Sequence, residues 1–296
     1  MKKLGLVFVV LFLLSSFYAC EKDQLGVYNP KMKIDKIYNE KDGRYLLEQW
    51  QWNDKLLSKI DFYRSNESLK ATHTYLYDEN RLTRVQMEGS YSDFIYDGKE
   101  LRTINTYTGS QLLETYQLSF KKDKLSHISI KRSAKGGTDS DLMSFFIPGS
   151  DHLSLSRPSS SESKGENYDY SAAEMDFVWD GDNVQYLKMS ITRPDSIQHL
   201  TFSYVYDDNM NPKHGFLSLY PIQSILNDEP QYQLCSKNNI VSVMVTDEYD
   251  IFSKTESFTY SYEYYKNYPT KVYHTFLNKE TWMQDSTLIY SYIYLY

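Results

Sequence analysis

The sequence has little of what several protein classes depend on. Only 2 of its 296 residues are Cys, which excludes a disulfide-based scaffold. The 39 Asp and Glu outnumber the 32 Lys and Arg, so the formal net charge is −7. This charge argues against nucleic acid as a partner, because phosphate binding needs a basic face. Aromatic residues, in contrast, are abundant: the chain has 29 Tyr, 14 Phe and 4 Trp and is 41% hydrophobic, as a globular protein is.

Sequence signatures of catalysis are also missing. The chain has no Gly-x-Ser-x-Gly turn, no phosphate-binding Gly loop and no Cys-x-x-Cys. The six His show no metal-ligand spacing; they are His73, His127, His152, His199, His214 and His274. We therefore expect no catalytic residue, no metal and no cofactor, and we predict that the protein is not an enzyme. A glycosidase stays open as an alternative, because two distant carboxylates leave no local pattern.

The N-terminus has the form of an export signal. A basic start, Met1–Lys3, precedes an apolar stretch, Leu4–Leu14, that is too short to span a membrane. We predict a signal peptide over residues 1–19. No later stretch reaches about 18 apolar residues, so we expect no spanning helix elsewhere in the chain.

The residues that follow the signal resemble a bacterial lipoprotein cleavage site. Ala19 directly precedes Cys20, and in lipoproteins such a Cys receives acyl chains that include palmitate. The resemblance implies that Cys20 is lipidated, that residues 20–33 form a linker, and that the membrane is a partner through the acyl chains. Glu21–Gln24 is similar to the acidic tags of surface-exposed Bacteroidetes lipoproteins. The alternative is an ordinary secretory signal followed by a coincidental Cys.

A repeated block carries the fold prediction. In each copy an aromatic residue is followed by turn-forming or charged residues, then by one apolar residue at position +5 and another at +8. The copies begin at Trp52, Tyr77, Tyr96, Phe120 and Trp179, and a sixth begins at Cys235 with Ile240 and Val243 after it. Each block reads as a β-hairpin in which a strand ends on the aromatic residue and Asp, Asn or Gly forms the turn.

The hairpins predict an all-β fold. We expect a large antiparallel meander of a dozen or more strands that forms a curved sheet or an open barrel-like roll over residues 34–296. The segment 134–173 has loop-forming composition. It either divides the domain into two lobes, 34–133 and 174–296, or connects two parts of one continuous sheet.

Acidic clusters fit turns better than ion sites. Asp180-Gly181-Asp182-Asn183 has enough oxygen atoms for Ca²⁺, but it lacks the ligand spacing of a calcium loop and falls where the repeat predicts a hairpin turn. We interpret Asp207-Asp208-Asn209 and Asp247-Glu248 in the same way. Cys235 takes the aromatic position of its repeat, so we expect a small buried side chain there.

Tyr recurs at every second residue in several predicted strands. Phe202, Tyr204 and Tyr206 share one face, and so do the alternate residues of Phe258–Tyr264 and Tyr290–Tyr296. Such Tyr residues stabilise strands through cross-strand pairs. An exposed row could instead stack on sugar rings.

The sequence is similar to a family of Bacteroidetes outer-membrane lipoproteins with a porin-like β fold. The likeness rests on the segments Phe202–Pro212, Asn238–Val241 and Tyr260–Lys271. Tyr77–Leu82 and Tyr96–Leu101 also resemble the tyrosine-aspartate repeats of bacterial shell and adhesin-like proteins. The resemblance implies a fold and a location, and it brings no catalytic residues.

These features together favour a lipid-anchored, non-catalytic protein of the outer membrane that faces the cell surface. We expect it to bind or adhere, with a glycan or surface polymer as the candidate partner. The alternative is a periplasmic-side carrier of a lipid or other apolar ligand. A transmembrane β-barrel, suggested by the alternation in Leu288–Tyr296, is less favoured.

Overall fold

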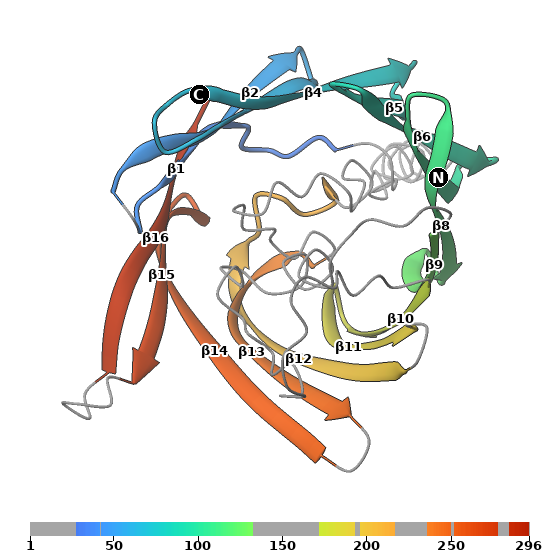
Figure 1. The fold of residues 1–296 in the computed structure, drawn as a ribbon. Coiled ribbons are helices and arrows are strands. Elements are labelled where there is room, and N and C mark those ends of the chain that lie inside the picture. The colour runs from blue at the N-terminus through green and yellow to red at the C-terminus, as the bar shows by residue number, and fades with distance from the viewer. Residues whose placement is uncertain are drawn as a thin grey trace, which may run out of the picture.

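The structure is a computed structural model of the chain, and it is a closed β-barrel (Figure 1). It describes residues 28–41, 43–132, 172–192, 196–216, 236–249, 252–277 and 284–295. The strands are β1 Ile34–Asn39, β2 Tyr45–Asn53, β3 Leu56–Tyr63, β4 Leu69–Asp78, β5 Arg81–Met87, β6 Ser90–Asp97, β7 Glu100–Thr108, β8 Gln111–Lys121, β9 Lys124–Arg132, β10 Ala172–Asp180, β11 Asn183–Thr192, β12 Ile197–Met210, β13 Asn238–Tyr249, β14 Phe252–Tyr265, β15 Tyr268–Leu277 and β16 Gln284–Tyr294.

The strands follow one another around the barrel in chain order. Every consecutive pair is antiparallel, and β16 pairs with β1 to close the sheet. β9 and β10 also pair directly, although a long connection separates them in the sequence. The predicted all-β meander of hairpins is confirmed, and the sheet closes into a barrel.

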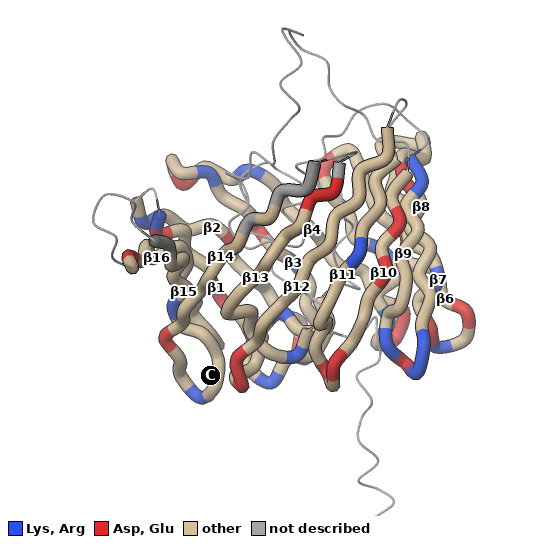
Figure 2. Tube along the Cα trace, turned by 90° about the horizontal axis from the view of Figure 1, so that it is seen from below, with Lys and Arg blue, Asp and Glu red and all other residues tan. Residues whose placement is uncertain are grey.

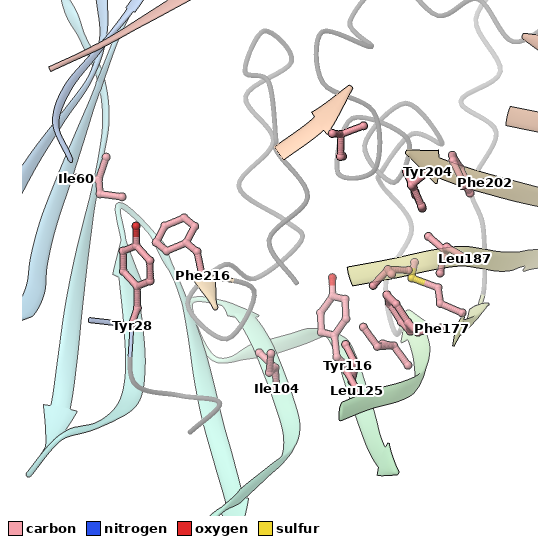
Figure 3. Close-up of a cluster of buried hydrophobic side chains, with 14 of the residues drawn as sticks. Tyr28, Ile60, Ile104, Tyr116, Leu125, Phe177, Leu187, Phe202, Tyr204 and Phe216 are labelled. Carbon is pink, nitrogen blue, oxygen red and sulfur yellow. The ribbon is translucent and has the colours of Figure 1, made fainter. Parts of the chain in front are cut away.

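Each strand has an apolar face and a polar face. In β10, Ala173, Met175 and Phe177 are buried, whereas Glu174 and Asp176 between them are exposed. Since the outside of a lone barrel cannot be covered, the buried face is the inner one. Figure 3 shows buried side chains of several strands gathered in the interior. The wall is therefore apolar inside and polar outside.

A β-bulge explains the +5 and +8 spacing of the repeat. In the β6–β7 hairpin, Tyr96 lies opposite Leu101 and Ile95 opposite Thr103, so Arg102 is an extra residue in β7. The extra residue shifts the alternation by one position. Leu101 and Ile104 consequently both point inward, although alternation alone would place them on opposite faces.

The turns of the repeat use backbone conformations that few residues favour. The first residue of the two-residue turn has a positive φ in six of the hairpins. These residues are Asp54, Glu79, Gly98, Lys122, Gly181 and Lys266. Gly98 and Gly181 adopt this conformation at no steric cost. The predicted turns are confirmed, but Glu and Lys also occupy the left-handed positions.

The antiparallel order places all these turns at one end of the barrel. We call it the motif end and define it by turns 54–55, 79–80, 98–99, 122–123, 181–182 and 266–267. The C-terminus lies at this end as well (Figure 2). Salt bridges and hydrogen bonds join neighbouring turns, as between Lys124 and Asp182 at 3.4 Å.

Two sequence interpretations were wrong. Asp207–Asn209 and Asp247–Glu248 belong to strands β12 and β13, not to turns. Around Asp207 the strand register is irregular, and its carboxylate accepts hydrogen bonds from the backbone amides of Asn209 and Asn239, which gives it turn-like local bonding.

The repeat copy at Cys235 is also assembled differently. Ile240 pairs with Tyr206 of β12, so Tyr206 holds the aromatic position that the sequence assigned to Cys235. The reason is the long connection between β12 and β13, which separates the two strands of this unit in the sequence. Cys235 itself, Cys20, residues 1–19 and most of the segment 134–173 lie outside the described residues.

No helix in the described part of the chain has the length and apolarity needed to cross a membrane.

Candidate functional site

The buried apolar side chains of the barrel line its inner wall. This wall consists mainly of Ile, Leu, Val, Met, Phe and Tyr side chains. A barrel of about 8 strands can be filled by its own side chains, whereas barrels with more strands can enclose further chain segments, ligands or a channel. The buried side chains of the wall are at most 8% exposed, so other parts of the molecule cover them in this structure.

A described segment that follows β12 lies inside the barrel. It comprises residues 211–216, and we call it the inner segment. The Phe216 ring lies 5.0 Å from the Trp50 ring and 5.1 Å from the Tyr28 ring, measured between centroids. Tyr28 precedes β1, and its hydroxyl donates a hydrogen bond to the Pro212 carbonyl. Figure 3 shows Tyr28 and Phe216 side by side next to the wall.

A buried ion pair fixes the inner segment to the wall. Lys213 Nζ lies 3.2 Å from Glu48 Oε1, and the two residues are 4% and 3% exposed. The Trp50 indole N–H donates to the other Glu48 oxygen at 2.7 Å. Lys213 also lies 5.4 Å from the centre of the Trp50 ring, within range of a cation–π interaction. The charge on each partner is thereby compensated inside the barrel.

A second buried ion pair lies on another part of the inner wall. Arg132 at the end of β9 contacts Glu114 of β8, with Arg132 NH2 2.6 Å from Glu114 Oε1. The Tyr116 hydroxyl donates to the same carboxylate. The mostly apolar wall thus carries a few polar groups at defined positions, the composition typical of a ligand-binding interior.

A ring of aromatic residues surrounds the interior near the motif end. We call it the aromatic girdle; its members are Trp52, Tyr77, Tyr96, Phe120, Trp179, Tyr206, Tyr262 and Tyr294. Every even-numbered strand contributes one of them. The predicted alignment of the Tyr rows is confirmed for the described residues, and these rows line the inside of the barrel.

Six members of the girdle form hydrogen bonds to the preceding strand. The acceptor is in each case a backbone carbonyl of an odd-numbered strand. Trp52 donates to Ile34 at 2.8 Å, Tyr96 to Leu82 at 2.9 Å, Trp179 to Leu125 at 2.6 Å, Tyr206 to Val184 at 2.7 Å and Tyr294 to Pro269 at 2.7 Å, and Tyr262 donates to Ile240. In the repeat, an even-numbered strand and the odd-numbered strand that follows it form one hairpin. A hydrogen bond from the even-numbered strand to the odd-numbered strand before it therefore links each hairpin to the preceding hairpin.

Two members of the aromatic girdle do not form this hydrogen bond. Phe120 has no donor, and the Tyr77 hydroxyl is buried without a hydrogen-bond partner. Burial raises the pKa of Tyr77, and it raises the pKa of Tyr96 to about 12. These phenols are therefore neutral at physiological pH and serve as packing and hydrogen-bonding groups.

Two of the described His residues lie in different surroundings. His73 is buried against Phe62, with ring centroids 4.6 Å apart, and burial lowers the pKa of His73 to about 4. His127 lies on the outer wall between Glu174 and Asp176, at 3.0 Å and 2.8 Å. Among the described residues, no group of three or more His, Cys, Asp or Glu could hold a metal ion.

The acidic cluster considered for Ca²⁺ is a hairpin turn. Gly181 and Asp182 connect β10 and β11, and the Asp182 carboxylate lies 3.3 Å from Lys237 and 3.4 Å from Lys124. Hydrogen bonding to Lys237 and Lys124 holds the pKa of Asp182 below its usual value. Two lysines thus occupy the place that a cation would take.

Exposed apolar side chains gather on the outer wall over β10 to β13. Val178 of β10 lies opposite Tyr186 of β11, and Met244 of β13 and Val205 of β12 lie nearby on the same face. All four are more than a third exposed. The residues between them include Ser203 and other hydroxyl side chains, and Figure 2 shows few charged residues along the middle of β12 to β14.

Sequence reasoning missed the groups inside the barrel. Glu48 and Lys213 are 165 residues apart, and no sequence motif joins them. The only signal in the sequence was that Glu48, a charged residue, takes an inward-facing position in its strand. Its partner depends on how the chain returns into the barrel after β12, which the local pattern does not encode.

The fold is similar to that of solved porin-like proteins. One from Bacteroides vulgatus ATCC 8482 gives a TM-score of 0.54 at 10% identity, covering 90% of this chain and 99% of that one. Another from Bacteroides uniformis ATCC 8492 gives a TM-score of 0.49 at 12% identity, covering 92% and 100%. No family model and no curated protein matches the chain. The likeness to the first structure establishes a porin-like barrel fold.

Proposed function

We propose that the chain is a non-catalytic protein of the outer membrane, anchored by acylated Cys20, that binds an apolar ligand inside its barrel. The observation that carries this proposal is the apolar inner wall of a barrel with 16 strands. Water is a poor filler for such an interior, because exposing apolar surface costs free energy in proportion to its area. A lipid or another apolar molecule has the matching chemistry.

The distribution of Tyr residues argues against an external ligand on the Tyr rows. The inward rows include Tyr204, Tyr260 and Tyr292, all of which are buried. Stacking of these rings on an external glycan is therefore impossible in this conformation. Phe177 and Leu187 of the inner wall are 8% and 1% exposed, so an internal ligand reaches them when the parts of the molecule that cover them move aside.

The outer wall supports a barrel that lies outside the lipid bilayer. A spanning barrel needs an outward apolar band about 25 Å tall. Here charged pairs occupy the wall, such as Arg84 with Asp93 at 2.6 Å, and Lys188 is exposed between Asp176 and Thr201. A basic residue at the bilayer midplane costs about 2–4 kcal/mol, so a lipid anchor is the more suitable attachment.

Binding of a fluorescent fatty acid to the chain that begins at Glu21 tests the internal site. Phe177→Asn places a polar group on the inner wall, and Val178→Asn makes the same change on the outer wall next to it. We expect Phe177→Asn to weaken binding about tenfold or more, the equivalent of about 1.4 kcal/mol, and Val178→Asn to leave it unchanged. Circular dichroism checks that both variants fold. Equal affinity in the three proteins would contradict binding inside the barrel.

A second candidate function rests on the outer apolar patch. Tyr186 is 38% exposed and lies between Val178 of β10 and the hydroxyl side chain of Ser203 of β12. Such a surface suits a neutral glycan, which can stack on an aromatic ring and bond to hydroxyl groups. Screening against a glycan array, with Tyr186→Ala as the variant, tests this function. It fails if no glycan binds or if the variant binds equally well.

A further inference from the structure

Exposed aromatic and aliphatic side chains form a corner at the motif end. Tyr264 and Tyr265 are the last two residues of β14. Ile293 is the second-to-last residue of β16, and Leu295 directly follows this strand. Their exposed fractions are 36%, 43%, 40% and 44%. The Lys266 ammonium lies 5.2 Å from the centre of the Tyr265 ring. β15 pairs with both β14 and β16, so these residues share one part of the rim, which we call the tyrosine corner.

The chain enters the barrel beside this corner. The Leu295 amide donates to the Lys33 carbonyl at 2.9 Å, so the residue before β1 lies against the end of β16. Tyr28 lies inside the barrel near the same end, with its ring 5.7 Å from the Trp52 ring of the aromatic girdle. The path from Tyr28 back toward Cys20 therefore starts at the motif end.

The length of this path limits where Cys20 can lie. Eight residues separate Cys20 from Tyr28, and a fully extended chain spans about 3.3–3.6 Å per residue, or about 28 Å in all. Strands of this length, tilted by about 45°, stand roughly 20–25 Å tall. The opposite end is thus at the limit of an extended linker, whereas the motif end is within easy reach.

The chemistry of the tyrosine corner matches a lipid surface. Tyr and Lys are the residues that favour the headgroup region, where a ring can be half-buried and an ammonium stays hydrated. The hairpin turns of the motif end carry charged residues, for example Asp97 and Lys99, which keeps the rim among the headgroups and out of the hydrocarbon. At the opposite end, the described large apolar side chains that are more than a third exposed are Leu69 and Ile197, which lie on separate parts of the rim.

We propose that the motif end of the barrel lies on the membrane that holds the Cys20 acyl chains, with the tyrosine corner in contact with the lipid headgroups. This inference rests on the anchoring that forms part of the proposed function. It adds an orientation: the inner segment and the aromatic girdle face the bilayer, and the opposite end faces away from it.

Spin labels on the acylated protein test the orientation. In a Cys235→Ala background, single labels at Tyr265→Cys and Ile197→Cys are measured by power saturation in phosphatidylcholine vesicles, with oxygen as the apolar relaxant and a nickel chelate as the polar one. Mass spectrometry of the N-terminal peptide first establishes acylation of Cys20. We expect the label at position 265 to be at least several-fold more accessible to oxygen, relative to nickel, than the label at position 197.

Each other outcome overturns a distinct step. An unmodified Cys20 removes the anchor and the orientation with it, while leaving ligand binding by the barrel unaffected. Acylated protein in which both labels are aqueous contradicts contact by the tyrosine corner. Acylated protein in which position 197 is nearer the lipid reverses the orientation.

Discussion

Ile34 lies opposite Tyr294 in the β1–β16 pair, in the same relationship that Leu101 has to Tyr96 within a single hairpin. The register shift after Ile34 leaves Asp35 as the extra residue, as Arg102 is in β7. The two ends of the chain therefore assemble one further copy of the repeat. Closure of the barrel uses the same bulge and the same aromatic pairing as every other unit.

The girdle hydrogen bonds predict a difference between similar substitutions. Tyr96→Phe removes the donor to the Leu82 carbonyl, and we expect a loss of about 0.5–1.5 kcal/mol in the free energy of unfolding. Tyr77→Phe should be neutral or stabilising, because the Tyr77 hydroxyl is buried without a partner. Urea unfolding measures both. Equal losses in the two variants would contradict a role of the hydrogen bonds.

The buried ion pair predicts strong coupling between Glu48 and Lys213. Lys213→Met leaves the Glu48 carboxylate without its main compensating charge, and we expect a loss of about 3–5 kcal/mol. Glu48→Gln combined with Lys213→Met should recover a large part of it, because neither residue then carries a buried charge. A double-mutant cycle from denaturant unfolding gives the coupling energy. A coupling near zero would mean that the pair does not hold the inner segment.

The burial of Phe216 predicts that the inner segment contributes to the stability of the fold. It is 1% exposed and contacts the Trp50 and Tyr28 rings, so Phe216→Ala should cost about 3–5 kcal/mol. Tyr265→Ala, at a side chain that is 43% exposed, is the control and should change stability by less than about 0.5 kcal/mol. Thermal or urea unfolding compares them. A small effect of Phe216→Ala would show that the segment is not part of the folded core.

Local sequence patterns predicted the hairpins well because each unit carries its own information. The aromatic residue, the two turn residues and the apolar pair at +5 and +8 lie within nine residues, as at Tyr96–Ile104. The β-bulge that causes this spacing was not predicted. The sequence shows that the apolar alternation shifts by one position, but the unpaired extra residue becomes visible only when the two strands are paired. A further copy, Tyr264 with Pro269 and Val272, was missed because Pro replaces the usual Leu or Val.

Closure and the interior could not be predicted in this way. Pairing of β1 with β16 depends on the number of strands and on their twist, which are properties of the whole sheet. The same holds for the pairing of Ile240 with Tyr206 across the connection after β12. The predicted anchor at Cys20 and the linker up to residue 27 lie outside the described residues and stay predictions.

Buried His73 predicts a loss of stability in acid. Its pKa falls from 6.5 in the unfolded chain to about 4 in the barrel, so between these values the unfolded state binds more protons. The stability that comes from burying His73 in its neutral form is complete above pH 6.5, and it is lost as the pH falls toward 4. At about 1.4 kcal/mol per unit of pKa shift, the total is about 3 kcal/mol.

The measurement compares unfolding at pH 7 and pH 4.5 for the wild type and His73→Phe. Carboxylates titrate in both proteins, so the difference between them isolates His73. We expect the wild type to lose about 2–3 kcal/mol more than the variant over this interval. The same pH dependence in both would mean that His73 is not buried in its neutral form.

Native mass spectrometry of the chain that begins at Glu21 tests the central claim most directly. This chain lacks Cys20 and its acyl groups, so any lipid mass that it retains is bound without a covalent link. Exported behind a secretory signal that is cleaved before Glu21 and purified from the cell envelope without detergent, it should carry an apolar molecule that is released on unfolding, and Phe177→Asn should carry less of it than Val178→Asn. A ligand-free mass for the folded wild-type chain, with no apolar compound in its organic extract, would contradict the account.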